Sequence, residues 1–189
     1  MNWYKYSQLD PLVQQYNTLL EHSPTNIRIT GSGTSQSISL PGSKTILARD
    51  LLQQAVDRIK PILLQHNVKE IDTSPISQAN AIGLAISHQP GRIHIDLSKI
   101  FNAIRHQLPP IAQLDGMTTD PDTLNTYVNR VSAIILGELG EVISHEGKHN
   151  LQFGEAFQSG KPFTSVTERP AEQFGQKTRK QYFPQTFHQ

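Results

Sequence analysis

The residues with the clearest capacity for chemistry are His145, Glu146 and His149, which form a His-Glu-x-x-His pentapeptide. On a helix, His145 and His149 lie one turn apart on the same face, so both imidazoles can bind one metal ion. Glu146 then points toward water at that ion and can accept its proton. The chain contains no cysteine, so a metal must be bound by His, Asp or Glu side chains. Two imidazoles leave a third ligand to be found elsewhere.

A long amphipathic helix is expected to carry the pentapeptide. Asp120 and Pro121 match an N-cap and a first helical residue, and the helix is predicted to run toward Leu151 and to end before Gly154. The histidines should continue the inward face of this helix and lie at the floor of a cleft. The residues on this face are Leu124, Val128, Val131, Ile135, Glu138, Val142, His145 and His149.

Two glycines, Gly137 and Gly140, interrupt this helix and cost about 1 kcal/mol each relative to alanine. We therefore expect a neighbouring strand or helix to approach closely there. After a connection over 152–166, Thr167 is predicted to cap a last helix from Glu168 to about Tyr182.

This last helix supplies a pattern that completes the site. The segment 167–175 reads Thr-Glu-Arg-Pro-Ala-Glu-Gln-Phe-Gly, and together with the pentapeptide it resembles the gluzincin branch of the zincin metallopeptidases. The segment is similar to one in several gluzincin families, including the anti-repressor peptidases. The order of helix, strands, active-site helix and glutamate helix also resembles that of the minimal gluzincins. The resemblance implies Zn²⁺ bound by His145, His149 and Glu168, with Glu172 supporting the site one turn later. Glu172 is also the alternative third ligand.

The resemblance implies an activity as well as a metal. A zinc metalloendopeptidase would hydrolyse peptide bonds in a protein or peptide substrate, with Glu146 as general base. An extended substrate is expected to align along an exposed strand edge, for which the strand predicted over 91–97 is the best candidate. Four side chains are candidates for the donor that stabilises the oxyanion: Tyr127, His94, Arg169 and Tyr182.

Other interpretations of the same region stay open. Lys148 stands where the pentapeptide usually has an uncharged residue, which favours a non-enzymatic zincin-like module whose zinc fixes the fold or a partner surface. Glu138 and Glu141 lie within two turns of His145, and Glu141 could complete a different carboxylate site. An open fourth position on zinc would favour the enzyme. A fourth protein ligand or a blocked cleft would favour the non-enzymatic module.

Several further side chains are assigned ordinary roles. Lys177, Arg179 and Lys180 are interpreted as a solvated face. The residues Trp3, Tyr4 and Tyr6 either pack in the core or cover the cleft as in an inhibited precursor. Surface or core positions are expected for the histidines that have no partner at metal-ligand spacing: His22, His66, His88, His106 and His188.

The chain as a whole is predicted to be one α+β domain over residues 1–189, a small zincin-like domain. Its expected parts are a backing helix, a short mixed sheet, the active-site helix and the glutamate helix. The N-terminal helical segment covers 1–22, with a helix after Asp10-Pro11, and the glutamate helix and tail cover 153–189.

The expected sheet comes from two parts of the chain. The alternating residues over 27–29 and 38–40 predict a hairpin, and further strands are predicted over 68–71, 81–86 and 92–97. The backing helix is expected to be capped by Ser43 and to kink or end at Pro61, and a short helix is expected over 97–108.

Composition restricts the partners. A formal net charge of +1 gives no electrostatic reason to expect nucleic acid or an anionic membrane as a partner. The chain has no apolar run that approaches a membrane span, and its N-terminus lacks the apolar core of a secretory signal. The cytoplasm is therefore expected, although export without a cleaved signal would leave the same pattern. The sequence does not indicate an oligomeric state.

Overall fold

The structure is a computed structural model that describes residues 10–40, 44–107 and 120–184. It combines helices with a small mixed sheet, as expected for an α+β chain. The helices are α2 (Pro11–Glu21), α3 (Ala48–Gln65), α4 (Leu97–Arg105), α5 (Pro121–Ser159) and α6 (Glu168–Tyr182). The strands are β1 (Arg28–Thr30), β2 (Ser37–Leu40), β3 (Lys44–Leu47), β4 (Glu70–Asp72), β5 (Gly83–Ala85) and β6 (Arg92–Ile95). Two short 3-10 turns are η1 (Ser32–Ser35) and η4 (Phe163–Ser165).

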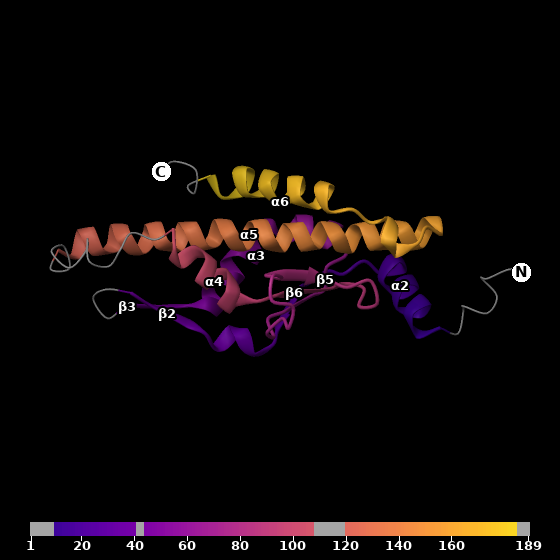
Figure 1. Ribbon diagram of the computed structural model, residues 1–189, viewed down its shortest axis with the longest axis horizontal. Coiled ribbons are helices and arrows are strands. Elements are labelled where there is room, and N and C mark those ends of the chain that lie inside the picture. Colours follow the sequence, from indigo (N-terminus) through magenta and orange to yellow (C-terminus); the bar gives the residue numbers. More distant parts are fainter. Residues whose placement is uncertain (1–9, 41–43, 108–119, 185–189) are drawn as a thin grey trace, which may run out of the picture.

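The main sheet has the order β1-β4-β6-β5. Both β1 and β6 run parallel to β4, whereas β5 is antiparallel to β6 and lies at the edge. Helix α5 runs along one side of this sheet, and α6 lies on the opposite side of α5 (Figure 1). The site helix is thus enclosed between the sheet and α6.

The core forms where α5 meets the sheet and α3. Apolar residues repeat at helical spacing in both helices, and burying each such side chain stabilises the fold by about 1.5–3 kcal/mol. Fully buried members of this core come from all three layers: Val131, Ile135, Leu139 and Ile143 from α5, Leu52, Ile59 and Leu63 from α3, and Ile71, Ile93 and Ile95 from the sheet.

The expected end of α5 near Leu151 is wrong, because the helix continues to Ser159. Gly154 does not break it but is buried, where a Cβ would lie 3.7 Å from Leu20 of α2. The helix ends instead at Gly160, whose φ of 68° is the left-handed conformation typical of a C-terminal cap. This extension gives α2 a surface to pack against and adds the next two turns to the site helix.

The predicted hairpin over 27–40 is also wrong. Strand β1 pairs in parallel with β4, and β2 pairs with β3 in a separate two-stranded sheet. The residues after the expected Ser43 cap form β3, so α3 begins only at Ala48, while Ser43 itself lies outside the described residues. Pro61 does not end α3, which continues to Gln65.

Other predicted elements are confirmed to within a few residues. Helix α2 begins after Asp10, whose carboxylate accepts a hydrogen bond from the Leu12 N–H at 2.9 Å. The turn over 88–91 joins β5 to β6, with Gly91 at a φ of 84°. The aromatic residues Trp3, Tyr4 and Tyr6 lie outside the described residues.

Close packing of α6 on α5 depends on glycine. A Cβ on Gly140 would collide with the ring of Phe183, which follows α6 and is buried. On the other helix, a Cβ on Gly175 would lie 2.9 Å from the Glu141 carbonyl oxygen and 3.2 Å from the Cβ of His145. The expectation of a close approach at Gly140 is thus confirmed. The two contacts fix where α6 presents its first residue, Glu168.

None of the helices in the described ranges combines the length and the apolar character needed to cross a bilayer.

Candidate metal site and cleft

The predicted ligands come together in space. The Nε2 atom of His145 lies 2.7 Å from one carboxylate oxygen of Glu168, and the Nε2 atom of His149 lies 3.0 Å from the other. The two imidazole rings are 4.9 Å apart between centroids. Glu168 reaches them because it is the first residue of α6.

This arrangement fits a small metal ion. One ligand atom from each of His145, His149 and Glu168 can be chosen so that all three lie within 4.8 Å of one another. Tetrahedral zinc with ligands about 2.0–2.2 Å away requires donor atoms roughly 3.3–3.5 Å apart. The His–Glu168 distances of 2.7 and 3.0 Å are shorter than this, and the Glu168 side chain, which is 70% exposed, has room to move outward. Across the described ranges this group has three protein members, which would leave one position open on a tetrahedral metal ion.

Gln152 orients one of the imidazoles and was missed by the sequence analysis. Its side-chain oxygen lies 3.0 Å from Nδ1 of His149, and its amide nitrogen donates to the Thr167 carbonyl oxygen at 3.3 Å. A proton on Nδ1 leaves the Nε2 lone pair of His149 directed at the site. The sequence did offer one indication of this role, because Gln152 follows His149 by three residues and therefore lies on the same face of the helix.

Glu146 lies beside the proposed ligands but is less exposed to solvent than Glu168. Its residue is 7% exposed, and its carboxylate oxygen is 3.9 Å from Nε2 of His145. Burial, and next the negative charge of Glu168, raise the pKa of Glu146 to about 8, although a hydrogen bond from the Ala85 backbone acts in the opposite direction. A carboxyl group in this environment binds a proton readily near neutral pH.

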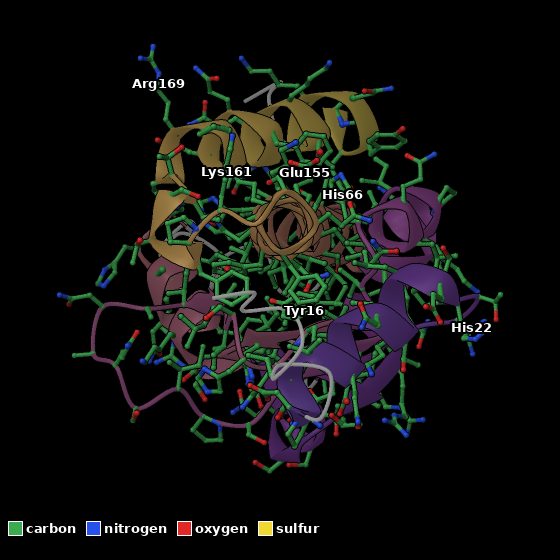
Figure 2. All side chains as sticks on the ribbon, turned by 90° about the vertical axis from the view of Figure 1, so that its right-hand side faces the viewer. Tyr16, His22, His66, Glu155, Lys161 and Arg169 are labelled. Carbon is green, nitrogen blue, oxygen red and sulfur yellow. The ribbon has the colours of Figure 1, made fainter. Side chains whose placement is uncertain are left out.

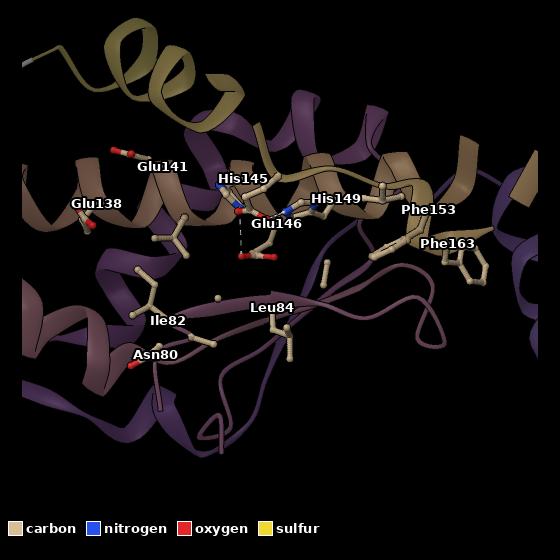
Figure 3. Close-up of a pocket in the computed structure, with 16 residues that line it drawn as sticks. Asn80, Ile82, Leu84, Glu138, Glu141, His145, Glu146, His149, Phe153 and Phe163 are labelled. Atoms are coloured by element: carbon tan, nitrogen blue, oxygen red, sulfur yellow. Dashed lines mark hydrogen bonds and ion pairs between the residues drawn. The ribbon is translucent and has the colours of Figure 1, made fainter. Parts of the chain in front are cut away.

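Strand β5 approaches Glu146 closely because of Gly83. A Cβ on Gly83 would lie only 2.8 Å from Cγ and Oε1 of Glu146 and 2.8 Å from Val142. The glycine therefore allows the strand to pass directly over the carboxylate, as Figure 3 shows.

Burial also affects the imidazole of His145. Desolvation lowers the pKa of His145, the positive form of His149 lowers it further, and the carboxylate of Glu168 partly offsets both. A lowered pKa keeps the imidazole neutral, which is the form that binds a metal.

These groups open into one cleft of about 560 Å³. Helix α5 forms one wall, strand β5 and the preceding residues form the other, and the segment before α6 closes one end (Figure 3). Its lining residues are Asn80, Ala81, Ile82, Gly83, Leu84, Ala85, Glu138, Glu141, Val142, His145, Glu146, His149, Phe153, Phe163, Val166 and Glu168.

The expected substrate edge over 91–97 is wrong. Strand β6 is an interior strand that pairs with both β4 and β5, so β5 is the edge next to the cleft. The Asp96 N–H donates to the Ile82 carbonyl oxygen at 2.9 Å. Because hydrogen-bonded residues alternate along an antiparallel pair, the backbone groups of Gly83 and Ala85 point away from β6 and toward the cleft.

No direct contact in the described residues supports the role expected for Glu172. Its charge raises the pKa of His145, but in the described part of the chain no hydrogen bond joins Glu172 to the two histidines. Glu168 makes those contacts instead.

The four candidate oxyanion donors all lie away from the described cleft lining. Tyr127 is eighteen residues before His145, about 27 Å along the helix axis. His94 interacts with Gln89 at 2.7 Å, and Arg169 points outward at the start of α6 (Figure 2). Tyr182 is at the other end of α6 and packs against the core.

Arg179 is not part of a solvated face. Its side chain is 16% exposed, and one terminal nitrogen donates to Glu138 at 2.7 Å and to Glu141 at 2.9 Å. The carboxylate of Glu141 is thus directed to Arg179, so the different metal site considered for it has no support. Lys177 and Lys180 are exposed as expected.

Lys148 and His66 lie behind the site, outside the cleft lining. The ammonium of Lys148 is 5.8 Å from the ring centroid of Phe174 on α6, and the His66 ring is 4.8 Å from the same ring. Lys148, which stands where the pentapeptide usually has an uncharged residue, thus contributes to the contact between α5 and α6.

Comparison with known proteins gives no match: no family model fits the chain, and no curated protein or solved structure is significantly similar.

Proposed function

We propose that the chain is a zinc-dependent metallopeptidase of zincin type, with His145, His149 and Glu168 as ligands and Glu146 as general base. The observation that carries the proposal is that a three-member ligand set and a buried carboxylate meet at the floor of one open cleft. A bound zinc ion supplies a Lewis acid that polarises a carbonyl and acidifies water.

Glu146 moves the proton in this proposal. Its carboxylate accepts a proton from water as the water attacks the peptide carbonyl, and then returns the proton to the leaving amine. The first transfer requires the ionised carboxylate, and a zinc cation bound beside Glu146 would lower the pKa that burial raises. Gly83 and Ala85 exclude bulk water from one side of the carboxylate.

Strand β5 is the proposed guide for the substrate. The Gly83 N–H and the carbonyl groups of Gly83 and Ala85 can pair with an extended peptide, which adds a strand to the sheet edge, while the Ala85 N–H is already bound to Glu146. Such a peptide would lie along the free edge of β5 in the cleft, and its carbonyl would lie next to the two histidines. This pairing needs an extended chain, so unfolded or loop segments are the expected substrates.

The rival function is a zincin-like module in which zinc is structural. An open cleft beside a ligand group of three favours the enzyme, because a structural zinc site is closed by a fourth protein ligand. Lys148, which favoured the module, contacts Phe174 and does not enter the cleft.

The decisive experiment compares wild type with Glu146→Gln. We expect both proteins to bind one zinc ion per chain, measured by elemental analysis after dialysis. The wild type should cleave an unstructured protein such as casein, and Glu146→Gln should lose about 10²–10⁴-fold of that rate. Glu168→Gln should lose zinc affinity as well as activity.

The matched control is Glu155→Gln, the same change at an exposed position of α5 outside the cleft. It should retain zinc and activity. A folded wild type without zinc affinity would remove the proposal altogether. Full activity of a zinc-loaded Glu146→Gln protein would remove the role of Glu146.

A further inference from the structure

One end of the cleft carries an excess of negative charge. Glu138 and Glu141 line it, and both bind the same nitrogen of Arg179. Two carboxylates and one guanidinium leave a net charge of about −1 in this trio. Their side chains are 20% and 29% exposed, so water screens this charge less than it would at a fully exposed position.

Apolar surface separates this acidic end from the proposed reaction centre. Val142 on α5 and Ile82 before β5 line the cleft from opposite walls. Lysine and arginine side chains bury their methylene stem on apolar surface and keep the charged group at a polar position. The acidic end therefore has the chemistry to bind a long cationic side chain.

The other end of the cleft is aromatic. Phe153 and Phe163 meet edge to face at 5.8 Å between centroids, and Val166 lies next to them in the lining. Phe163 is held from behind by Tyr16 of α2, with ring centroids 5.5 Å apart. A firmly packed apolar surface of this kind suits an aromatic or aliphatic side chain.

The spacing of the two ends fits a short extended peptide. Glu141 and Phe153 lie six residues before and six after Gly147, the midpoint of the two histidines. Six helical residues span about 9 Å. An extended peptide covers that length with about three residues.

From this geometry we propose that the cleft selects substrates with lysine or arginine within about three residues on one side of the cleaved bond and an aromatic or aliphatic residue within about three on the other. The position of that bond depends on the proposed peptidase function. The selection itself depends on the charge and apolar surface of the two ends.

The test measures peptide binding apart from turnover. Fluorescent peptides that differ only by Lys or Glu at the positions facing the acidic end are titrated onto zinc-loaded Glu146→Gln protein. The Lys peptide should bind at least about tenfold more tightly than the Glu peptide. Adding Glu141→Gln leaves one carboxylate paired with Arg179, so the trio becomes neutral and the ratio should fall to within about twofold.

Two further variants check the sign of the effect. Adding Arg179→Met raises the negative charge of the trio, so the preference for Lys should increase. Adding Glu155→Gln removes a carboxylate outside the cleft and should leave the ratio unchanged. Because removal of Arg179 also affects packing between α5 and α6, zinc affinity of that variant is measured alongside.

Three results bear on the inference. Equal affinity for the two peptides, or no binding of either, would overturn it. Cleavage of casein by wild type with equal affinities would retain the peptidase function and refute the selectivity. Selective binding without any cleavage would refute the peptidase function and retain the selectivity as a property of a peptide-binding cleft.

Discussion

His66 allows a prediction whose size follows directly from its surroundings. The residue caps α3 and is 7% exposed, and no hydrogen-bond partner in the described part of the chain reaches its Nδ1. Burial, with a smaller effect from the charge of Lys148, lowers the pKa of His66 to about 4. The folded protein therefore resists protonation of this imidazole, whereas the unfolded chain accepts the proton with a pKa near 6.5.

Stability must then fall as the pH falls. Above about pH 6.5 the imidazole is neutral in both states, so its contribution is complete. Between pH 6.5 and 4 the unfolded state binds more protons than the folded state, and each step toward lower pH favours unfolding. With pKa values of 6.5 and about 4, the change from pH 7 to pH 5 lowers the free energy of unfolding by about 2 kcal/mol through His66 alone.

The assay is urea unfolding of wild type and His66→Leu at pH 7 and pH 5, with a chelator present so that metal binding does not contribute. The difference in unfolding free energy between the two proteins should change by about 2 kcal/mol between these pH values. His22→Leu, at an exposed position, measures the effect of losing an imidazole where it is not buried (Figure 2). A change below about 0.5 kcal/mol would refute the reasoning from burial.

Three other substitutions test the support of the site. Gln152→Ala should weaken zinc binding about 10–100-fold by freeing the ring of His149, as measured by competition with a chelating dye, and unchanged affinity would contradict that role. Gly83→Val should abolish cleavage by displacing Glu146 while zinc remains bound, so an active zinc-loaded protein would disprove the close approach. Tyr16→Phe should lower the unfolding free energy by about 1 kcal/mol, because its hydroxyl donates to a backbone carbonyl oxygen beyond β5 at 2.6 Å.

The local part of the site could be predicted from the sequence because it depends on helical spacing. His145, Glu146 and His149 share one helix, and the start of α6 at Glu168 follows from the composition of its first turn. The expected cap at Thr167 is present by position, although its side chain makes no capping hydrogen bond. The proximity of Glu168 to the two histidines was predicted from the resemblance to gluzincins, and the local sequence pattern alone did not indicate it.

The parts that were missed depend on contacts between distant segments. Parallel pairing of β1 with β4 joins residues some forty positions apart, so alternation within 27–40 could not reveal it. The pairing of Arg179 with two glutamates requires the alignment of α6 on α5, which the contacts at Gly140 and Gly175 determine. The position of Arg179 near the end of the polar helix α6 does not by itself indicate that two glutamates of α5 lie beside it.

The location of Glu168 on a separate helix has a thermodynamic consequence for any metal bound as proposed. Its carboxylate is mostly exposed, so its local concentration near the histidines is set by how firmly α6 stays docked on α5. By reciprocity, the metal strengthens docking by the same free energy that docking adds to metal affinity. The remote end of α6, where Phe183 packs over Gly140, is thereby coupled to the occupancy of the site. A ligand that loosened that end would release the metal without touching it.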